Sequence, residues 1–434
     1  MDQEAEWAAG RRVGQGEPAA PAAAVRVLPG LQRQLASLPR PLALAWPGGS
    51  AGAPRAALRV TLHRRRQLLG FMRGRIGDLA DAHVRGEMDI EGSMRDLMAV
   101  AGALVRDPVP QRAPPPWQQA IATLRSHWQH RPWRDAAQVR AHYDLSDDFF
   151  ALFLDPRRVY SCAYYAAPGM TLAQAQEAKL DLVCRKLQLA PGQRFLDIGA
   201  GWGALLLWAA QHYGVQATGI TLSRHQHAHV SRLIEDAGLV GRVEVKLLDY
   251  RELQDAAPFD RIASVGMFEH VGRARLVDYF GHLHRLLRPG GVLLNHGIAA
   301  GGLDNHELGA GMGRFIDRYI FPGGELVHVA QATQALARGG LELLDAENLR
   351  PHYARTLWAW SDTLEAQIDQ ARALASEATV RAYRLYLAGS ALCFERGWLS
   401  LYQLLAARSD VAPDSATGWP ARCDYPFTRR HMPG

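Results

Sequence analysis

Short apolar runs alternate with amphipathic stretches through the middle of the chain, and turn residues separate them. Amphipathic spacing and turn signals predict helices between the apolar runs, for example over 276–287. Strand–helix alternation of this kind builds a doubly wound parallel sheet with helices on both faces. The runs predicted to be strands are residues 195–198, 214–221, 243–249, 259–265 and 292–296.

The pattern changes toward both ends of the chain. Apart from an apolar patch at 42–46, the first residues lack periodicity and are rich in Ala, Pro, Gly and Arg, which is typical of disorder. An alternating strand at 58–63 and a helix over 94–104 indicate a small α/β domain. The predicted organisation is a mostly disordered segment 1–57, a small domain 58–106, a proline-rich linker 107–118, a main domain 119–408 and a loose tail 409–434.

Beyond residue 300 the sequence becomes helical and rich in aromatic residues. Helices are expected near 329–338, 356–375 and 377–407. We expect this part to form a helical lid or an apolar pocket over the sheet.

The first strand of the main domain runs into a glycine-rich turn, Asp197-Ile198-Gly199-Ala200-Gly201-Trp202-Gly203. Glycine is needed where the chain turns sharply or where backbone must approach a ligand without a Cβ in the way. The spacing is Asp-x-Gly-x-Gly-x-Gly and not the G-x-G-x-x-G of dinucleotide sites. The next strand ends in Thr221 without an acid that could hold an NAD ribose. These details favour S-adenosylmethionine (SAM), with a purely structural turn as the alternative.

Other polar residues also fall at the expected carboxyl ends of strands, where open α/β sheets bind ligands. They are Asp197, Thr221, Asp249, Glu269 and His296. We therefore expect a site along this edge of the sheet.

The charge of the 434-residue chain is unevenly distributed. Residues 1–140 carry 20 Arg and 12 Asp or Glu, a net charge of +8, which leaves −2 of the total +6 for residues 141–434. A basic N-terminal third suggests an anionic partner, either lipid headgroups or nucleic acid. An arginine-rich but merely solvated surface is the alternative.

Cysteine usage and hydropathy bear on the cellular compartment. The four cysteines, Cys162, Cys184, Cys393 and Cys423, are scattered without metal-ligand spacing and are interpreted as reduced thiols. No apolar run approaches the roughly 20 residues of a membrane span. The acidic start of the chain is unlike a secretory signal. We expect a cytoplasmic protein that touches the inner membrane surface without crossing it, and no metal site.

Several motifs in the chain resemble those of the cyclopropane-fatty-acyl-phospholipid synthases and the related mycolic acid cyclopropane synthases. The resemblance covers about residues 140–408. The motifs are His142-Tyr143-Asp144-Leu145-Ser146, Tyr160-Ser161-Cys162-Ala163-Tyr164, the glycine turn, Thr221-Leu222-Ser223, Asp249-Tyr250, Gly266-Met267-Phe268-Glu269-His270-Val271-Gly272 and Tyr319-Ile320-Phe321-Pro322-Gly323-Gly324.

The resemblance implies an enzyme with a Rossmann-like SAM-dependent methyltransferase fold. Such an enzyme adds a methylene group from SAM across a cis double bond of an unsaturated phospholipid, with bicarbonate as the base. The implied SAM contacts are Tyr160, Ser161, Gly199, Gly201, Thr221, Leu222, Gln226 and Tyr250; Asp197 and Asp249 are added as cofactor-binding candidates from their strand ends. The implied bicarbonate ligands are Cys162, Glu269, His296 and Tyr353, with Ser390 standing where the family often has a Cys.

Two other functions stay open on the sequence. A related C-methyltransferase would share the carbocation and quench it differently, giving methyl- or methylene-branched acyl chains. A non-enzymatic lipid- or nucleic-acid-binding module is the third. On the leading interpretation the partners are membrane phospholipids and not nucleic acid, and a homodimer is left open.

Overall fold

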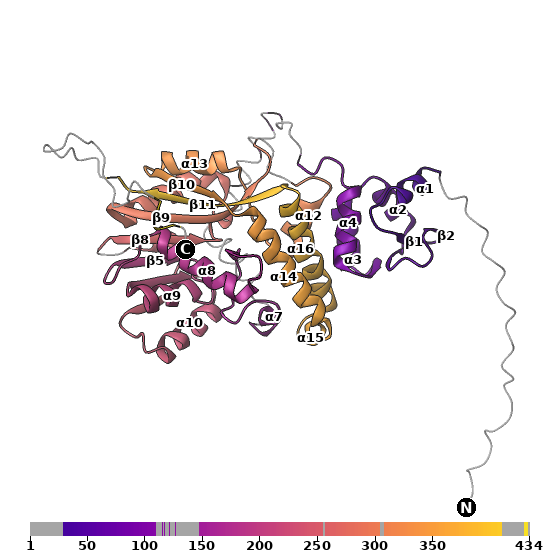
Figure 1. The fold of residues 1–434 in the computed structure, drawn as a ribbon. Helices are drawn as coiled ribbons and strands as arrows, with labels where there is room; N and C mark the ends of the chain where they lie inside the picture. Colours follow the sequence, from indigo (N-terminus) through magenta and orange to yellow (C-terminus); the bar gives the residue numbers. More distant parts are fainter. Residues whose placement is uncertain are drawn as a thin grey trace, which may run out of the picture.

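The computed structural model describes residues 29–109, 115, 117, 121, 126, 147–254, 257–303, 308–409 and 429–432. It contains a four-stranded sheet near the N-terminus and a seven-stranded sheet in the larger part of the chain. Figure 1 shows these two parts at opposite ends, with long helices between them. The expected N-terminal disorder before residue 29, the motif at 142–146 and most of the tail lie outside the described residues.

The small domain begins earlier than predicted. Helix α1 and strands β1 and β2 occupy residues that were expected to be mostly disordered, so that prediction is wrong for 29–52. The reason is strand pairing on both sides of β1, which forms a hairpin with β2 and a parallel pair with the more distant β3. The elements are α1 Pro29–Ala36, β1 Leu42–Trp46, β2 Gly49–Gly52, β3 Leu58–Leu62, α2 Arg65–Met72, α3 Ile76–Val84, β4 Met88–Glu91 and α4 Met94–Leu104.

The large sheet confirms the doubly wound prediction. Its strand order is β10-β11-β9-β8-β5-β6-β7, and β5 to β9 run parallel. Chain order reverses beside β5, which is the position where open α/β sheets bind ligands. The elements are α7 Asp147–Ala151, α8 Leu172–Lys186, β5 Arg194–Ile198, α9 Ala204–Tyr213, β6 Gln216–Thr221, α10 Arg224–Asp236, β7 Val243–Leu247, η1 Tyr250–Glu252, β8 Phe259–Val265, η2 Phe268–His270, η3 Arg273–Arg275, α11 Leu276–Leu286 and β9 Leu287–Ala300.

The last two strands correct the helical prediction for the C-terminal part. The helix expected over 377–407 ends at Glu395, and Leu399–Ala407 forms β11, antiparallel to β9 and to β10 Glu342–Asn348. Gly397, with φ of 70°, ends the helix in the left-handed conformation that favours glycine. Because β11 lies inside the sheet and is buried along most of its length, its apolar run shows little alternation.

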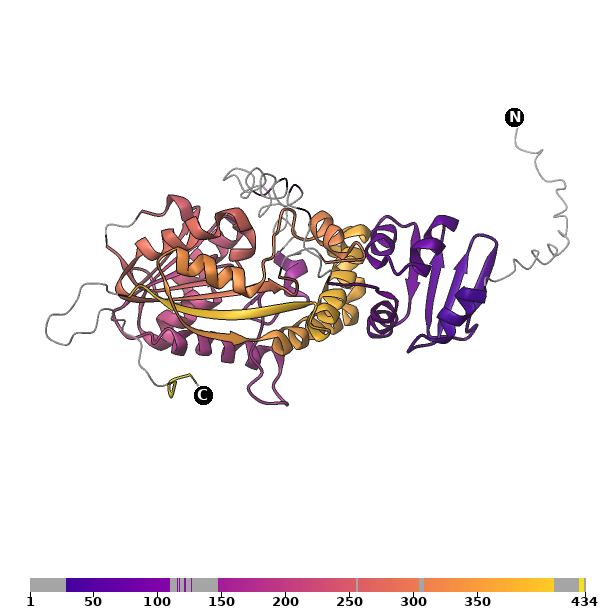
Figure 2. The ribbon, with the colours of Figure 1, turned by 90° about the horizontal axis from the view of Figure 1, so that it is seen from above.

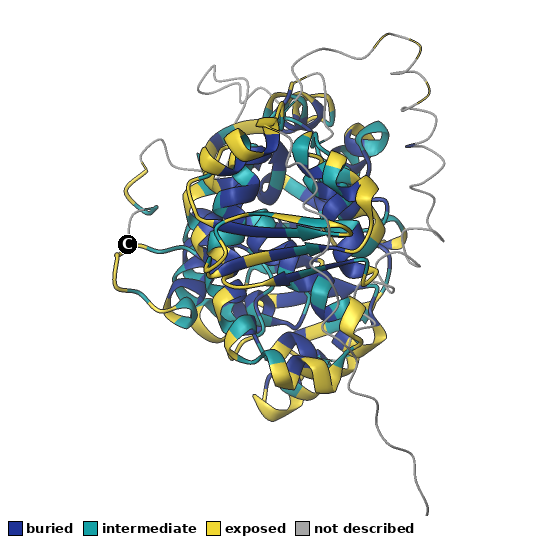
Figure 3. Cartoon of the chain, turned by 90° about the vertical axis from the view of Figure 1, so that its right-hand side faces the viewer, coloured by how far each residue is buried: buried dark blue, intermediate teal, exposed yellow. Residues whose placement is uncertain are grey.

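A helical layer separates the large sheet from the small domain (Figure 2). It consists of α12 Met312–Tyr319, α14 Arg350–Ala366, α15 Ile368–Leu374 and α16 Glu377–Glu395, while α13 Val329–Arg338 packs against α11 and β10. One apolar cluster runs from the small domain through α14 and α16 to Trp202. Figure 3 shows buried strands inside and exposed outer helix faces.

The small domain is docked closely on this helical layer. The backbone N–H of Gly77 donates to Ala310 O at 3.0 Å, and a Cβ on Gly77 would lie 2.1 Å from the carbonyl carbon of Gly311. Arg95 forms two hydrogen bonds with the Asp362 carboxylate, at 3.2 and 2.5 Å. Backbone contact this close leaves little freedom for the two parts to slide.

Candidate active site

The glycine turn after β5 has the open backbone that the sequence predicts. Gly199, Gly201 and Gly203 have φ of 79°, 56° and 86°, and α9 begins directly after them. The N–H groups of Gly199 and Ala200 both donate to Ile220 O, which ties the turn to β6. A Cβ on Gly201 would meet no atom nearer than 4.0 Å. This space beside bare backbone fits the close approach of a ligand.

The ends of β6 and β7 provide polar side chains that are already oriented. The Thr221 hydroxyl donates to the Gln226 side-chain oxygen at 2.8 Å, and Leu222 beside it is half-buried. Asp249 caps η1 by accepting from the backbone N–H of Arg251 at 2.9 Å. The Tyr250 ring packs edge-on against Tyr279.

A cavity of about 1150 Å³ lies beside this edge of the sheet. Of the predicted site residues, seven line it: Tyr160, Ser161, Cys162, Glu269, His296, Tyr353 and Ser390. The other eight, Asp197, Gly199, Gly201, Thr221, Leu222, Gln226, Asp249 and Tyr250, are not part of its wall. The two groups are adjacent, since a Cβ on Gly199 would lie 3.3 Å from Met267, two residues before Glu269.

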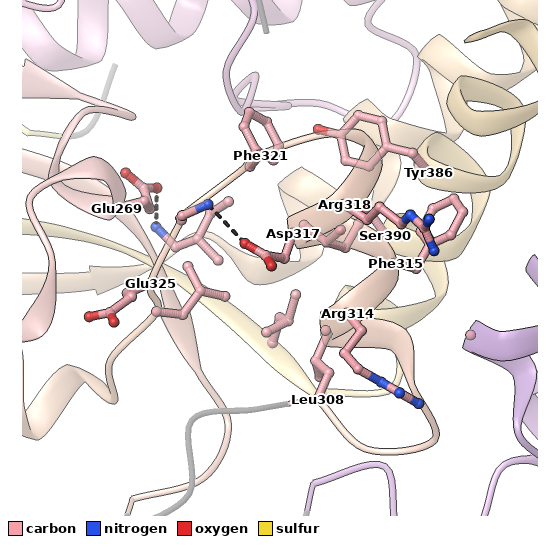
Figure 4. A pocket seen from close by; sticks show the side chains of 18 of the residues that line it. Glu269, Leu308, Arg314, Phe315, Asp317, Arg318, Phe321, Glu325, Tyr386 and Ser390 are labelled. Carbon is pink, nitrogen blue, oxygen red and sulfur yellow. Dashed lines mark hydrogen bonds between the residues drawn. The ribbon is translucent and has the colours of Figure 1, made fainter. Parts of the chain in front are cut away.

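A backbone N–H of β9 orients the Glu269 side chain on the cavity wall (Figure 4). Its Oε1 accepts from the backbone N–H of Ile298 at 2.8 Å, while Oε2 has no partner among the described residues. The side chain is buried, and the loss of solvation raises the pKa of Glu269 to about 7. Oε2 can therefore accept a hydrogen bond from a ligand.

His296 is buried and its bonding network determines which ring nitrogen carries the proton. Lys186 Nζ donates to Gln403 Oε1 at 2.7 Å, so the Gln403 amide NH₂ faces His296 Nδ1 at 3.2 Å and donates to it. Burial and the nearby Lys179 and Lys186 lower the pKa of His296 to about 3, so the ring is neutral. Its hydrogen is then on Nε2, which has no partner among the described residues.

The remaining predicted anion ligands are parts of the wall, where Cys162 and Tyr353 have neighbours of their own. The Cys162 thiol is directed at Ala163 O, 3.1 Å away, and burial raises the pKa of this thiol above its usual range. Tyr353 packs against the ring of Phe394. Ser390 is half-buried on the wall, whereas Cys393, one turn further along α16, is not part of it.

Aromatic rings form much of the wall. The Tyr160 hydroxyl bonds that of Tyr386 at 3.4 Å, and Trp117, Phe315, Phe321 and Phe394 also line the cavity. Aromatic faces attract positive charge. The cavity therefore combines aromatic side chains, and charged ones such as Arg318 and Asp81, with the two unpartnered polar atoms of Glu269 and His296.

Two residues that position the 160–162 segment escaped prediction. From α8, Gln176 donates to Ser161 O at 2.8 Å and Lys179 donates to Ser161 Oγ at 3.1 Å. Burial lowers the pKa of Lys179 to about 8 and raises that of Asp197 to about 7, while the charge of each opposes the shift of the other. A sequence signal for them does exist. Gln176, Lys179 and Lys186 recur at helical spacing on the same face as the apolar Val183, so polar side chains lie on a face of the predicted helix that is expected to be buried.

Comparison with known proteins decides the family. The family model for mycolic acid cyclopropane synthetase matches residues 130–404. The chain belongs to this family. A probable fatty acid methyltransferase of Pseudomonas putida is 40% identical over 404 residues, which cover 92% of this chain and 98% of that protein.

Mycobacterial members of the family are matched by a shorter part of the chain. Cyclopropane mycolic acid synthase 1 of Mycobacterium tuberculosis is 42% identical over 277 residues, 62% of this chain and 95% of that protein. A crystal structure of mycolic acid cyclopropane synthase CmaA1 complexed with SAH and CTAB superposes with a TM-score of 0.59 at 40% identity, covering 63% of this chain and 98% of that chain. The shared part therefore has the length of the family match and does not extend over the whole chain.

In the part of the chain that the structure describes, no three His, Cys, Asp or Glu side chains are grouped so as to hold a metal ion. Within the same residues, no helix combines the length and apolar character needed to span a bilayer.

Proposed function

We propose that the protein transfers a methylene group from SAM across a cis double bond of an unsaturated phospholipid, with bound bicarbonate as the base. One observation carries this proposal beyond family membership. Two buried polar atoms, Glu269 Oε2 and His296 Nε2, have no partner among the described residues and belong to the wall of a large cavity with aromatic lining. Buried polar groups need hydrogen-bond partners, so this pair calls for a small polar ligand.

SAM fits the glycine turn and the ends of β6 and β7. The open space at Gly201 admits a ligand against backbone, and Thr221 and Gln226 offer uncharged polar groups. A 40% identical family member has been crystallised with SAH. SAM supplies an electrophilic methyl group: the two π electrons of the alkene bond to this carbon as the sulfur–carbon bond breaks, which leaves a carbocation on the lipid.

The cavity wall suits that cation. The rings of Tyr160, Phe321, Tyr353 and Tyr386 present faces or edges around the cavity, and aromatic faces stabilise nearby positive charge. Loss of one proton from the added methyl carbon, with closure of the carbon–carbon bond, gives the cyclopropane ring and neutralises the lipid.

Bicarbonate fits the two unpartnered atoms. It carries both an acceptor oxygen and a hydroxyl donor, which complement His296 Nε2–H and Glu269 Oε2. Bound there, it supplies the base for the proton on the methyl carbon. Glu269 would orient the anion through its hydroxyl, and His296 would hold a charged oxygen. Because the Cys162 thiol faces a backbone carbonyl, we assign it to the wall rather than to the anion.

The Glu269→Gln variant tests the anion site. Gln retains an acceptor for Ile298 N–H but loses the carboxylate, so turnover should fall by roughly 10²-fold, as for a lost acid–base group. SAM affinity, measured by calorimetry, should hardly change. Turnover of the parent should drop when bicarbonate is stripped from the buffer and recover when it is restored. Parental turnover of Glu269→Gln in carbonate-free buffer would show that the base lies elsewhere.

A C-methyltransferase is the second candidate, since a relative covering 92% of this chain is described as a probable fatty acid methyltransferase. Cyclopropane and methylene-branched products are isomers, so mass alone does not separate them. Mild hydrogenation before mass spectrometry of lipids from an expressing host does. A cyclopropane keeps its mass, whereas a methylene branch gains two hydrogens.

We also propose that the small domain brings the enzyme to anionic bilayers at the cytoplasmic face. Residues 29–104 carry 11 Arg and 6 acids, a net charge of +5. Arg64, Arg66 and Arg85 all pair with Glu87, and Arg85 also pairs with Asp81, so three arginines face two acids. Each basic residue near an anionic surface contributes about 1 kcal/mol, screened by salt. Co-sedimentation with anionic vesicles should weaken as salt rises; equal binding to neutral vesicles would contradict the proposal.

A further inference from the structure

A second cavity of about 140 Å³ lies between the small domain and the helical layer. Phe71, Leu79 and Met98 of the small domain form one side of it, and Leu385 and Leu392 of α16 form the other. No charged side chain is among its lining residues. Its wall is thus completed only by the docking of the small domain.

The second cavity shares part of its wall with the large one. Phe315, Ile316, Tyr386 and Ser390 line both of them, so the two cavities adjoin at α12 and α16. Arg273, Arg314 and Arg318, by contrast, line only the large cavity. Because these arginines pair with Glu325, Asp78 and Asp81 of the same wall, the large cavity holds charged groups of both signs that the second cavity lacks. A ligand that spans both would have its polar end in the large cavity and its apolar end under the small domain.

We propose that the second cavity receives the methyl end of the acyl chain, so that the small domain sets how much chain is accepted beyond the double bond. This inference rests on the proposed function and adds a specificity site to it. An acyl tail is the ligand that matches the wall, because each CH₂ group gains about 0.8 kcal/mol when buried in apolar surroundings.

The docking contacts give this cavity a defined size. Gly77 and Gly311 meet backbone to backbone, and Arg381 donates to His83 O at 3.0 Å. A wall held this closely cannot widen for a longer chain without breaking packed contacts. We therefore expect kcat/KM to fall sharply once the acyl tail is longer than the cavity can hold, and not to decline gradually with tail length.

Gly389 is a position from which a larger side chain can occupy part of the second cavity. It lies on α16 in the wall of the second cavity, and a Cβ there would meet nothing within 4 Å. Replacing a helical glycine also favours the helix, so Gly389→Leu should fold. Gly30→Leu is the matched control, because Gly30 is a helical glycine with the same open space, on α1 and outside both cavities.

The kinetic experiment uses the full chain and two phospholipids. Their double bonds stand at the same distance from the ester, and the tails beyond are short or long. Gly389→Leu should lower kcat/KM for the long tail by roughly tenfold, the loss expected when about two methylenes cannot be buried. The kcat/KM of Gly389→Leu for the short-tailed lipid should equal that of the parent. Gly30→Leu should have the parent's kcat/KM for both lipids. Equal loss for both tails, or no loss for either, would overturn the assignment.

A crosslinking experiment separates this inference from the proposed function, because it needs no turnover. A phospholipid with a diazirine at the methyl end of its acyl chain is irradiated with the parent protein. Crosslinks to Met98 or Leu392 support the second cavity even where no cyclopropane forms, in which case the reaction alone is wrong. Crosslinks confined to residues of the large cavity contradict it even where the reaction proceeds.

Discussion

The cofactor half and the anion half of the site consist of different kinds of groups. On the cofactor side, all candidate residues except Tyr160 and Ser161 lie within residues 197–250, at or just after the ends of three neighbouring strands. On the anion side, they are buried side chains from distant parts of the chain, with Glu269 and His296 supported by Gln403 and Lys186. Ligand binding in the cofactor half depends on where the backbone can approach the ligand. Ligand binding in the anion half depends on which side-chain atoms carry protons.

The largest effect is expected on the cofactor side. Gly201→Val puts a β-branched residue at φ of 56°, a conformation it rarely adopts, and fills the space beside the turn. SAM binding should be lost in calorimetry. Gly201→Asn is the matched control, because Asn tolerates this φ but also fills the space. Both variants should lose SAM binding, and only Gly201→Val should have a lower free energy of unfolding. Unchanged SAM affinity in Asn would show that the turn is only structural.

This contrast explains what the sequence could predict. The glycine turn, the parallel strands and the acid-free end of β6 are local patterns, and the structure bears out their backbone conformations. On the cavity wall, Glu269 and His296 are also predicted from their strand-end positions, whereas Cys162, Tyr353 and Ser390 are predicted only through the motif resemblance, since they are unremarkable in their own segments. Only the fold brings them to one cavity.

Long-range contacts account for what the sequence did not predict. Strand β11 was expected to be helical because its Leu, Ala and Gln residues favour helices, and its place inside the sheet overrides that preference. Gln403 lies on this strand, opposite His296 on β9. Once β11 was assigned to a helix, the bond that fixes the His296 proton could not be anticipated.

The next effect concerns the pH dependence of folding stability on the anion side. The pKa of Glu269 is raised to about 7 in the folded protein from 4.5. Between these values the folded state keeps a proton that the unfolded state loses, so stability falls as pH rises from 4.5 through 7. Gln cannot ionise. As the pH rises across this window, the free energy of unfolding of Glu269→Gln should therefore rise by about 3 kcal/mol relative to that of the parent.

Denaturant unfolding of both proteins in carbonate-free buffer at several pH values measures this gap. Asp197 and His296, whose pKa values are also shifted, remain in both proteins and cancel in the difference. A gap that does not change with pH would contradict a buried, weakly solvated Glu269. The Gly201 variants should show no such pH-dependent gap, because they change no ionisable group.

The smallest expected effect tests the proton position on His296. Gln403→Met removes the donor to Nδ1 at similar volume, so the hydrogen can occupy either ring nitrogen. The variant also removes the acceptor of the Lys186 Nζ bond, but only the bond to His296 acts on the ring. Losing that bond, worth about 1 kcal/mol, should lower kcat roughly fivefold. SAM affinity should stay as in the parent. In ¹⁵N NMR spectra the parent should carry the His296 hydrogen on Nε2, and the variant should show a mixture. Tyr402→Phe, at the preceding position of β11, is the control and should change neither kcat nor the spectrum. A parent with the hydrogen on Nδ1 would mean that His296 accepts from its ligand. The anion half would then need a donor other than this ring.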